Sequence, residues 1–222
     1  MVERFFSYAP TATPPHEDTG ITLVSGPSCC GKTSLLFQFA ANRAAESGRD
    51  VVFICSKGRL ETNPPFLSQG VEPSMGVLQR IKINGKYMLT FSSPRYVEDG
   101  EEIRKYFAAF HLLDDFPAAV IVDDFADFFS ERTCQQRYGN SRAQDLGMVR
   151  ILALCHDAIA HANTKLGSLG SCSLLLSDVH QGDGTGSYIL EKIGSAESGT
   201  REARTAKYSI ALQYLVLEEI SC

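Results

Sequence analysis

The chain has 222 residues, of which 44% are hydrophobic and 21% charged, a composition typical of a globular protein with one buried core. Its formal net charge of −5 argues against a broadly basic surface that coats nucleic acid, although a local basic groove remains compatible with it. No apolar run is long enough to span a membrane, and the N-terminus lacks the long apolar stretch of a signal peptide.

The N-terminal part is predicted to be an extended lead followed by one domain. Residues 1–19 contain three prolines among Thr and Ala, which is typical of a linker, so the domain is expected over 20–222. Residues 21–25, with apolar Ile21, Leu23 and Val24, predict a strand. After a short loop, helical spacing of apolar residues predicts a helix to about Ser47, with Gly48 as its stop.

The rest of the chain continues the alternation of strands and helices. Residues 51–55 form a continuous apolar run typical of a buried parallel strand, and residues 56–76 look irregular. The remaining expected elements are strands over 78–83 and 86–91 joined by an Asn84-Gly85 hairpin turn, a helix over 99–113, a strand over 118–122, a helix over 148–162, a strand over 173–176 and a β-rich end over 207–220. This order predicts an α/β fold around a mostly parallel sheet.

Residues 26–33 match the phosphate-binding pattern G-x-x-x-x-G-K-S/T, between a predicted strand and a predicted helix. The glycines let backbone N–H groups turn toward phosphate oxygens, and the helix N-terminus adds its positive dipole end. Lys32 is expected to reach the β- and γ-phosphates of ATP and so to act in catalysis, and the Thr33 hydroxyl to ligate Mg²⁺. The residues expected around the nucleotide are Gly26, Pro27, Ser28, Cys29, Cys30, Gly31, Lys32, Thr33 and Ser34.

A second acidic signal follows about 90 residues later, where the apolar strand 120–122 ends in Asp123 and Asp124. This resembles a Walker B strand, so Asp123 is expected to hold Mg²⁺ together with Thr33. Asp124 either polarises a catalytic water or is a solvated acid at a strand end, and both interpretations stay open. Because the second strand is followed by no acid until Glu61, nucleotide binding is better supported than turnover, and at most a weak ATPase is expected.

The seven cysteines are odd in number and show no C-x-x-C spacing, which favours a reducing intracellular compartment. Cys29 and Cys30 are adjacent, so their side chains should diverge. A zinc site is therefore not expected there.

With these motifs, the chain resembles the RecA-type recombinase superfamily. The resemblance is carried by the helix segment 36–40, the turn 48–50 before the second strand, the Walker B strand 120–123, the polar-ended strand 173–178 and the strand 206–210, which resembles the fifth core strand. Within the superfamily, residues 53–60 and 78–83 make the chain most similar to the short paralogue that partners a SWIM-domain zinc protein in the Shu complex.

This resemblance implies a RecA-like P-loop NTPase core and an accessory role in homologous recombination DNA repair in the nucleus. The implied partners are a SWIM-domain zinc protein, a RecA-type recombinase and single-stranded DNA. Lys57 stands where the family places its catalytic glutamate, which implies slow or absent hydrolysis. An independent P-loop enzyme, such as a small-molecule or nucleotide kinase, and a pseudo-ATPase scaffold are the alternatives.

The loop after the Walker B strand, residues 125–143, is the segment that lies near DNA in RecA-like cores. Its arginines suit phosphates and its tyrosine suits base stacking, although a solvated charged loop explains the same residues. The DNA-binding candidates are Arg132, Arg137, Tyr138 and Arg142, and the three arginines also suit a kinase lid. Residues 6–9 fit the F-x-x-A segment with which recombinases dock on a neighbour; alternatively, Phe5 and Phe6 pack on this protein's own core.

Overall fold

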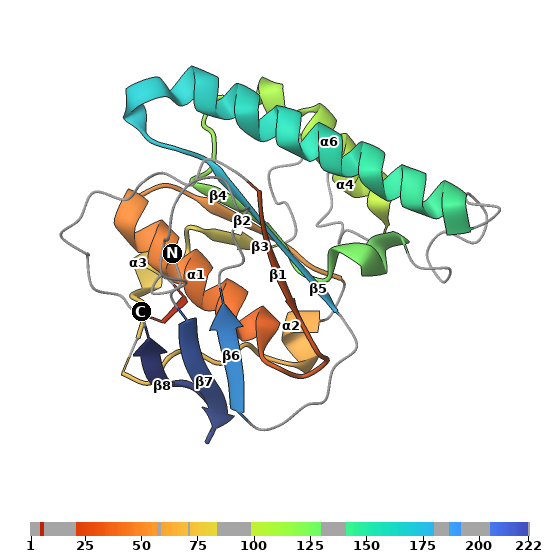
Figure 1. Ribbon diagram of the computed structural model, residues 1–222. Helices are drawn as coiled ribbons and strands as arrows, with labels where there is room; N and C mark the ends of the chain where they lie inside the picture. The colour runs from red at the N-terminus through yellow and green to blue at the C-terminus, as the bar shows by residue number, and fades with distance from the viewer. Residues whose placement is uncertain are drawn as a thin grey trace.

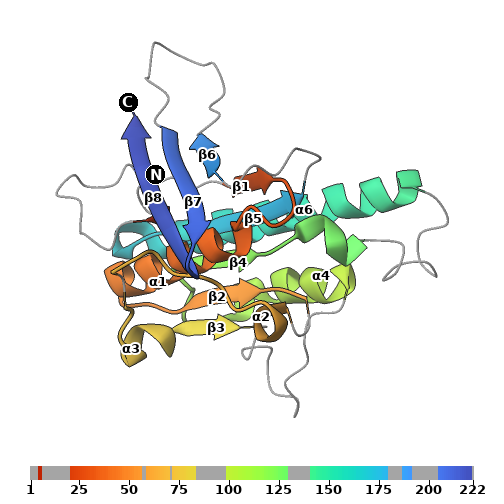
Figure 2. The same cartoon turned by 90° about the horizontal axis from the view of Figure 1, so that it is seen from below.

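The computed structural model describes residues 5–6, 21–56, 59–70, 72–83, 99–129, 141–179, 187–191 and 205–221. Five strands form a sheet in which every neighbouring pair is parallel, in the order β1-β5-β4-β2-β3 (Figure 2). Their bounds are Ile21–Gly26 (β1), Val51–Ile54 (β2), Ile81–Ile83 (β3), Ala119–Val122 (β4) and Ser173–Val179 (β5). The prediction of an α/β fold around a parallel sheet is confirmed.

Helices cover both faces of this sheet. On one face lies α1 with the short α3, and on the other lie α4 and the long α6 (Figure 1). The helix bounds are Lys32–Ser47 (α1), Arg59–Thr62 (α2), Met75–Leu78 (α3), Gly100–Ala108 (α4) and Ser141–Leu166 (α6), with 3-10 turns at Phe110–Leu112 (η2), Phe125–Phe129 (η3) and Gly167–Leu169 (η4). Of the helices among these residues, none has the length and apolar character needed to cross a membrane.

The core has two layers because strand side chains alternate between the faces of the sheet. Val51 and Phe53 of β2 pack on the α1 side, whereas Val52 and Ile54 pack against α4 and α6. All four residues are buried, which explains why β2 reads as a continuous apolar run rather than an alternating one.

A second, antiparallel sheet packs on the α1 side, at the bottom of Figure 1. Its strands are Ser187–Glu191 (β6), Thr205–Ala211 (β7) and Tyr214–Ser221 (β8). The expectation that residues 206–210 form a fifth strand of the parallel core is therefore wrong. Tyr208 of β7 is buried while Lys207 is exposed, and such one-sided alternation suits a half-covered antiparallel strand.

The expected element boundaries hold best where glycine or a cap defines them. The helix ending at Ser47 is confirmed, and Gly48 adopts a left-handed φ of 65° with its N–H donating to the Ala44 carbonyl. The strand expected over 78–83 begins only at Ile81, because Ser74 caps a turn of helix through Leu78. Residues 84–98, with the expected hairpin, lie outside the described part of the chain.

The predicted loop 125–143 is shorter than expected, because structured residues flank it. The 3-10 turn η3 takes up its start, and α6 begins at Ser141 rather than near Met148. Arg142 thus lies in the first turn of α6.

Phe5 and Phe6 are buried in the core, with exposures of 3% and 5%. The Phe5 ring lies 5.4 Å from that of Phe39, and the Phe6 ring 5.6 Å from that of Tyr208. Of the two readings of this segment, the structure supports packing on the protein's own core, since a buried Phe6 is not free to enter a partner's pocket.

Candidate functional site

The segment between β1 and α1 forms a tight loop at the carboxyl edge of the parallel sheet. Two of its residues take left-handed backbone conformations, Cys29 at φ 62° and Gly31 at φ 84°. At Gly31 the absence of a side chain also matters, because a Cβ there would lie 2.8 Å from Ile210. The first N–H groups of α1 have no intrahelical partner by geometry, so the helix presents donors and its positive dipole end at this loop.

Lys32, the first residue of α1, turns back into the loop. Its side chain is buried, and its Nζ donates to the Gly26 carbonyl at 3.0 Å and to the Pro27 carbonyl at 2.7 Å. The ammonium therefore lies inside the loop, close to the N-terminus of α1. Both features provide positive charge for a phosphate-bearing ligand.

Asp123, directly after β4, is the centre of a hydrogen-bond cluster. The Thr33 hydroxyl donates to its Oδ2 at 2.8 Å, and the Ser177 hydroxyl donates to its Oδ1 at 2.7 Å. Ser177 in turn accepts the Asp124 backbone N–H at 2.8 Å. Strand β5 lies between β1 and β4, so the sheet order brings Ser177 to this point. The polar end of this strand can be recognised in the sequence, but no motif singles out Ser177.

Arg59 completes the cluster, and sequence analysis missed it. Its Nε lies 2.8 Å from Asp123 Oδ2, and its Nη2 lies 2.5 Å from Asp124 Oδ2. Nη2 also donates to the Thr33 hydroxyl at 3.4 Å. Burial lowers the pKa of Arg59, but Asp123 and Asp124 raise it, and the carboxylates prevail. The signal in the sequence was the position of Arg59 shortly after the second strand, where the resemblance places a catalytic residue.

The two carboxylates differ in their surroundings. Burial raises the pKa of Asp123, against the opposing effects of Arg59, Ser177 and Thr33. Asp124 adopts a left-handed backbone with φ 52°, and its Oδ1 is buried with no hydrogen-bond partner among the described residues. Such a residue is strained and incompletely satisfied, which is more often seen at functional sites than elsewhere.

The structure brings together Thr33 and Asp123, the expected Mg²⁺ ligands. However, both oxygens of Asp123 already accept hydrogen bonds, and Oδ2 carries the Arg59 guanidinium. The described residues also contain no group of three or more His, Cys, Asp or Glu side chains placed to hold a metal. In this arrangement the oxygens of Thr33 and Asp123 do not fit a divalent cation, because the Arg59 guanidinium already lies against them.

Of the DNA-binding candidates, Arg142 alone lies within the described residues. Arg142 is exposed on α6, while Arg132, Arg137 and Tyr138 lie outside the described residues, as does Lys57. Cys29 is exposed and Cys30 buried, which confirms that their side chains diverge.

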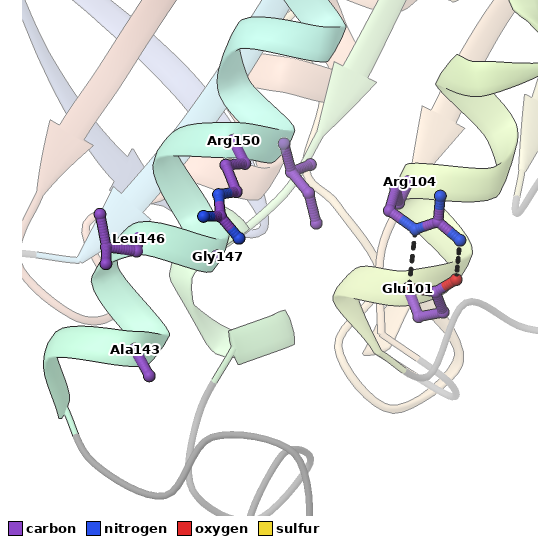
Figure 3. A pocket seen from close by; sticks show the side chains of 7 residues that line it. Glu101, Arg104, Ala143, Leu146, Gly147 and Arg150 are labelled. Atoms are coloured by element: carbon purple, nitrogen blue, oxygen red, sulfur yellow. Dashed lines mark hydrogen bonds and ion pairs between the residues drawn. The ribbon is translucent and has the colours of Figure 1, made fainter.

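A separate hollow of about 350 Å³ lies between α4 and α6. Figure 3 shows Glu101 and Arg104 from α4 on one side of it, with Leu146 and Arg150 from α6 on the other. It shares no residue with the cluster around Asp123.

Comparison with known proteins leaves the site to be interpreted from its own geometry. No model of a known protein family matches the chain, and a search of the curated proteins found no match.

Proposed function

We propose that residues 26–34 bind the phosphates of ATP within a RecA-like P-loop core. The observation that carries this proposal is the Lys32 ammonium, which is buried inside a strand–loop–helix turn at the N-terminus of α1. Phosphate oxygens would replace neutral carbonyl oxygens as its partners, and hydrogen bonds between charged groups are the stronger kind.

We further propose an accessory role in homologous recombination, with slow or absent ATP hydrolysis. The role, the nuclear location and the partners (a SWIM-domain zinc protein, a recombinase and single-stranded DNA) rest on the sequence resemblance. Slow hydrolysis has additional support, because Arg59 pairs with both Asp123 and Asp124. The guanidinium occupies one oxygen of each carboxylate, which hinders either acid from accepting a proton from an attacking water.

Replacing Lys32 by Ala tests nucleotide binding. Loss of one charge-assisted contact, worth roughly 1.5–3 kcal/mol, should weaken ATP binding at least about tenfold. Titration of a fluorescent ATP analogue measures this, and Lys165→Ala is the control because Lys165 is exposed on α6. Equal affinity of wild type and Lys32→Ala would show that the site is misassigned.

Turnover and partners separate the alternatives. We expect single-turnover hydrolysis far slower than the enzyme median of about 10 s⁻¹. Affinity purification of the full chain should recover a SWIM-domain protein or a recombinase. Rapid phosphoryl transfer to a small molecule would support the kinase instead, and undetectable ATP binding would support the scaffold.

A further inference from the structure

We propose that Arg59 serves as the cation of this site in place of a divalent metal, so that the chain binds nucleotide phosphates with little dependence on Mg²⁺. This inference rests on the proposed ATP binding, and it concerns a residue outside the phosphate-binding and Walker B motifs.

The geometry places the guanidinium where a metal would need to bind. Arg59 contacts Asp123 and Asp124 through two different nitrogens, at 2.8 and 2.5 Å. One of these nitrogens also donates to the hydroxyl of Thr33, the second residue of α1. A single planar group thus engages both acids and the hydroxyl at the start of the helix, which suits the fork of N–H donors that arginine provides.

The electrostatics favour this cation over an added one. Asp123 is 1% exposed and Asp124 is 9% exposed, so their charges need a partner close by. The Arg59 guanidinium is that partner, and it stays charged at every ordinary pH. A divalent ion would have to displace it from Asp123 Oδ2. The Arg59 side chain is still 30% exposed, so it remains accessible from solvent.

The first test measures ATP affinity with excess Mg²⁺ and with EDTA. Wild type should change less than about threefold between the two conditions. Arg59→Ala should lose about tenfold or more in EDTA, because two buried carboxylates then face the phosphates, and should recover with Mg²⁺. Arg104→Ala, on the exposed surface of α4, is the matched control and should behave as wild type.

The second test uses Mg²⁺ alone and needs no nucleotide. Melting temperatures are compared in magnesium chloride and in sodium chloride of the same ionic strength. Arg59→Ala should gain about 2–4 °C from Mg²⁺, because the freed acids can bind it, whereas wild type should not respond. Arg59→Gln removes the charge but keeps hydrogen-bond donors, so it carries the same test if the Ala variant does not fold.

The outcomes distinguish this inference from the proposed function. Wild-type ATP affinity that rises tenfold with Mg²⁺, or a wild-type melting temperature that responds to Mg²⁺ as the variants do, overturns the role of Arg59. Variants that do not respond to Mg²⁺ also overturn it. If wild type binds no ATP in either condition, the proposed function fails, and the Mg²⁺-alone comparison still decides whether Arg59 occupies a cation position.

Discussion

Two charged side chains at the carboxyl edge of the parallel sheet, Lys32 and Asp123, are buried in contact with polar partners. Lys32 is held by the carbonyls of the loop, and Asp123 is held by hydroxyls and by Arg59. Each contact offsets part of the cost of removing a charge from water. Substitutions here should therefore change stability and ligand binding together, so every binding measurement needs a melting curve beside it.

Two buried thiols provide a pH test at the residue scale. Burial raises the pKa of Cys155 and of Cys172 from 9.0 to about 12. The folded state therefore keeps protons that the unfolded state releases above pH 9, so stability is complete below that pH and falls as pH rises. Between about pH 9 and 10, each thiol should lower the free energy of unfolding by about 1 kcal/mol per pH unit, and ionisation of the tyrosines contributes equally in wild type and in a thiol variant.

Urea unfolding at pH 8, 9 and 10 measures this effect. The double variant Cys155→Ala, Cys172→Ala should be less stable at every pH but should lose less stability on going to pH 10. A parallel decline in wild type and variant would contradict the assignment. Alkylation at pH 8, mapped by mass spectrometry, should modify the exposed Cys29 and spare both buried thiols.

At the scale of elements, α4 shows how a helix start is set by a cap and by packing. Asp99 accepts the N–H groups of Glu101 and Glu102, which satisfies two donors at the helix N-terminus. Gly100 follows because the Phe129 ring of η3 lies against it, and a Cβ there would come within 2.5 Å of that ring. The cap thus defines the helix start, and the glycine allows η3 to pack closely.

Gly100→Ala should destabilise the protein by about 1–3 kcal/mol, because the fully buried Phe129 ring cannot move aside. Gly76→Ala is the matched change. Gly76 is an exposed helical residue whose added Cβ would meet nothing nearer than 3.9 Å, so this change should be neutral or stabilise by about 0.5–1 kcal/mol. Urea denaturation compares the two, and equal effects would contradict the packing argument.

At the scale of the whole molecule, the antiparallel sheet supports the loop between β1 and α1, which we propose binds phosphate. Tyr208 of β7 donates its hydroxyl to the Cys30 carbonyl at 2.9 Å, and Leu215 of β8 pairs with residues 67–69, which in turn bond to α1. The Tyr208 ring also packs, at a tilt, against the rings of Phe6 and Tyr188. The loop is thus held between two sheets that are distant in the sequence.

Tyr208→Phe should weaken ATP binding about fivefold, since it leaves the buried Cys30 carbonyl without its donor, a loss of about 1 kcal/mol. The ring and its packing remain, so the melting temperature should fall by only a few degrees, roughly 2–4 °C. ATP titration measures the effect, with Tyr214→Phe as the control because Tyr214 is exposed. Unchanged affinity would mean that the second sheet does not support the loop.

Local sequence patterns were sufficient to predict most helices and strands and the loop between β1 and α1. The glycines, lysine and threonine of residues 26–33 lie within eight consecutive residues, so a local pattern is enough to recognise the loop. The buried strands could likewise be recognised from apolar runs such as 51–55. The α/β class follows from such local signals, because hydrophobic spacing decides whether a segment forms a strand or a helix.

Only the tertiary structure decided which distant residues meet. Ser177 and Arg59 reach Asp123 because β5 lies between β1 and β4 and because α2 begins just beyond β2, and no local pattern specifies that strand order. For the same reason the sequence did not show that residues 206–210 pair with β6 and β8 in a second sheet, because the strands that pair are selected by long-range packing. The sequence by itself thus indicated the strand–loop–helix segment of residues 21–47, whereas the place of Arg59 beside Asp123 depends on contacts that exist only after folding.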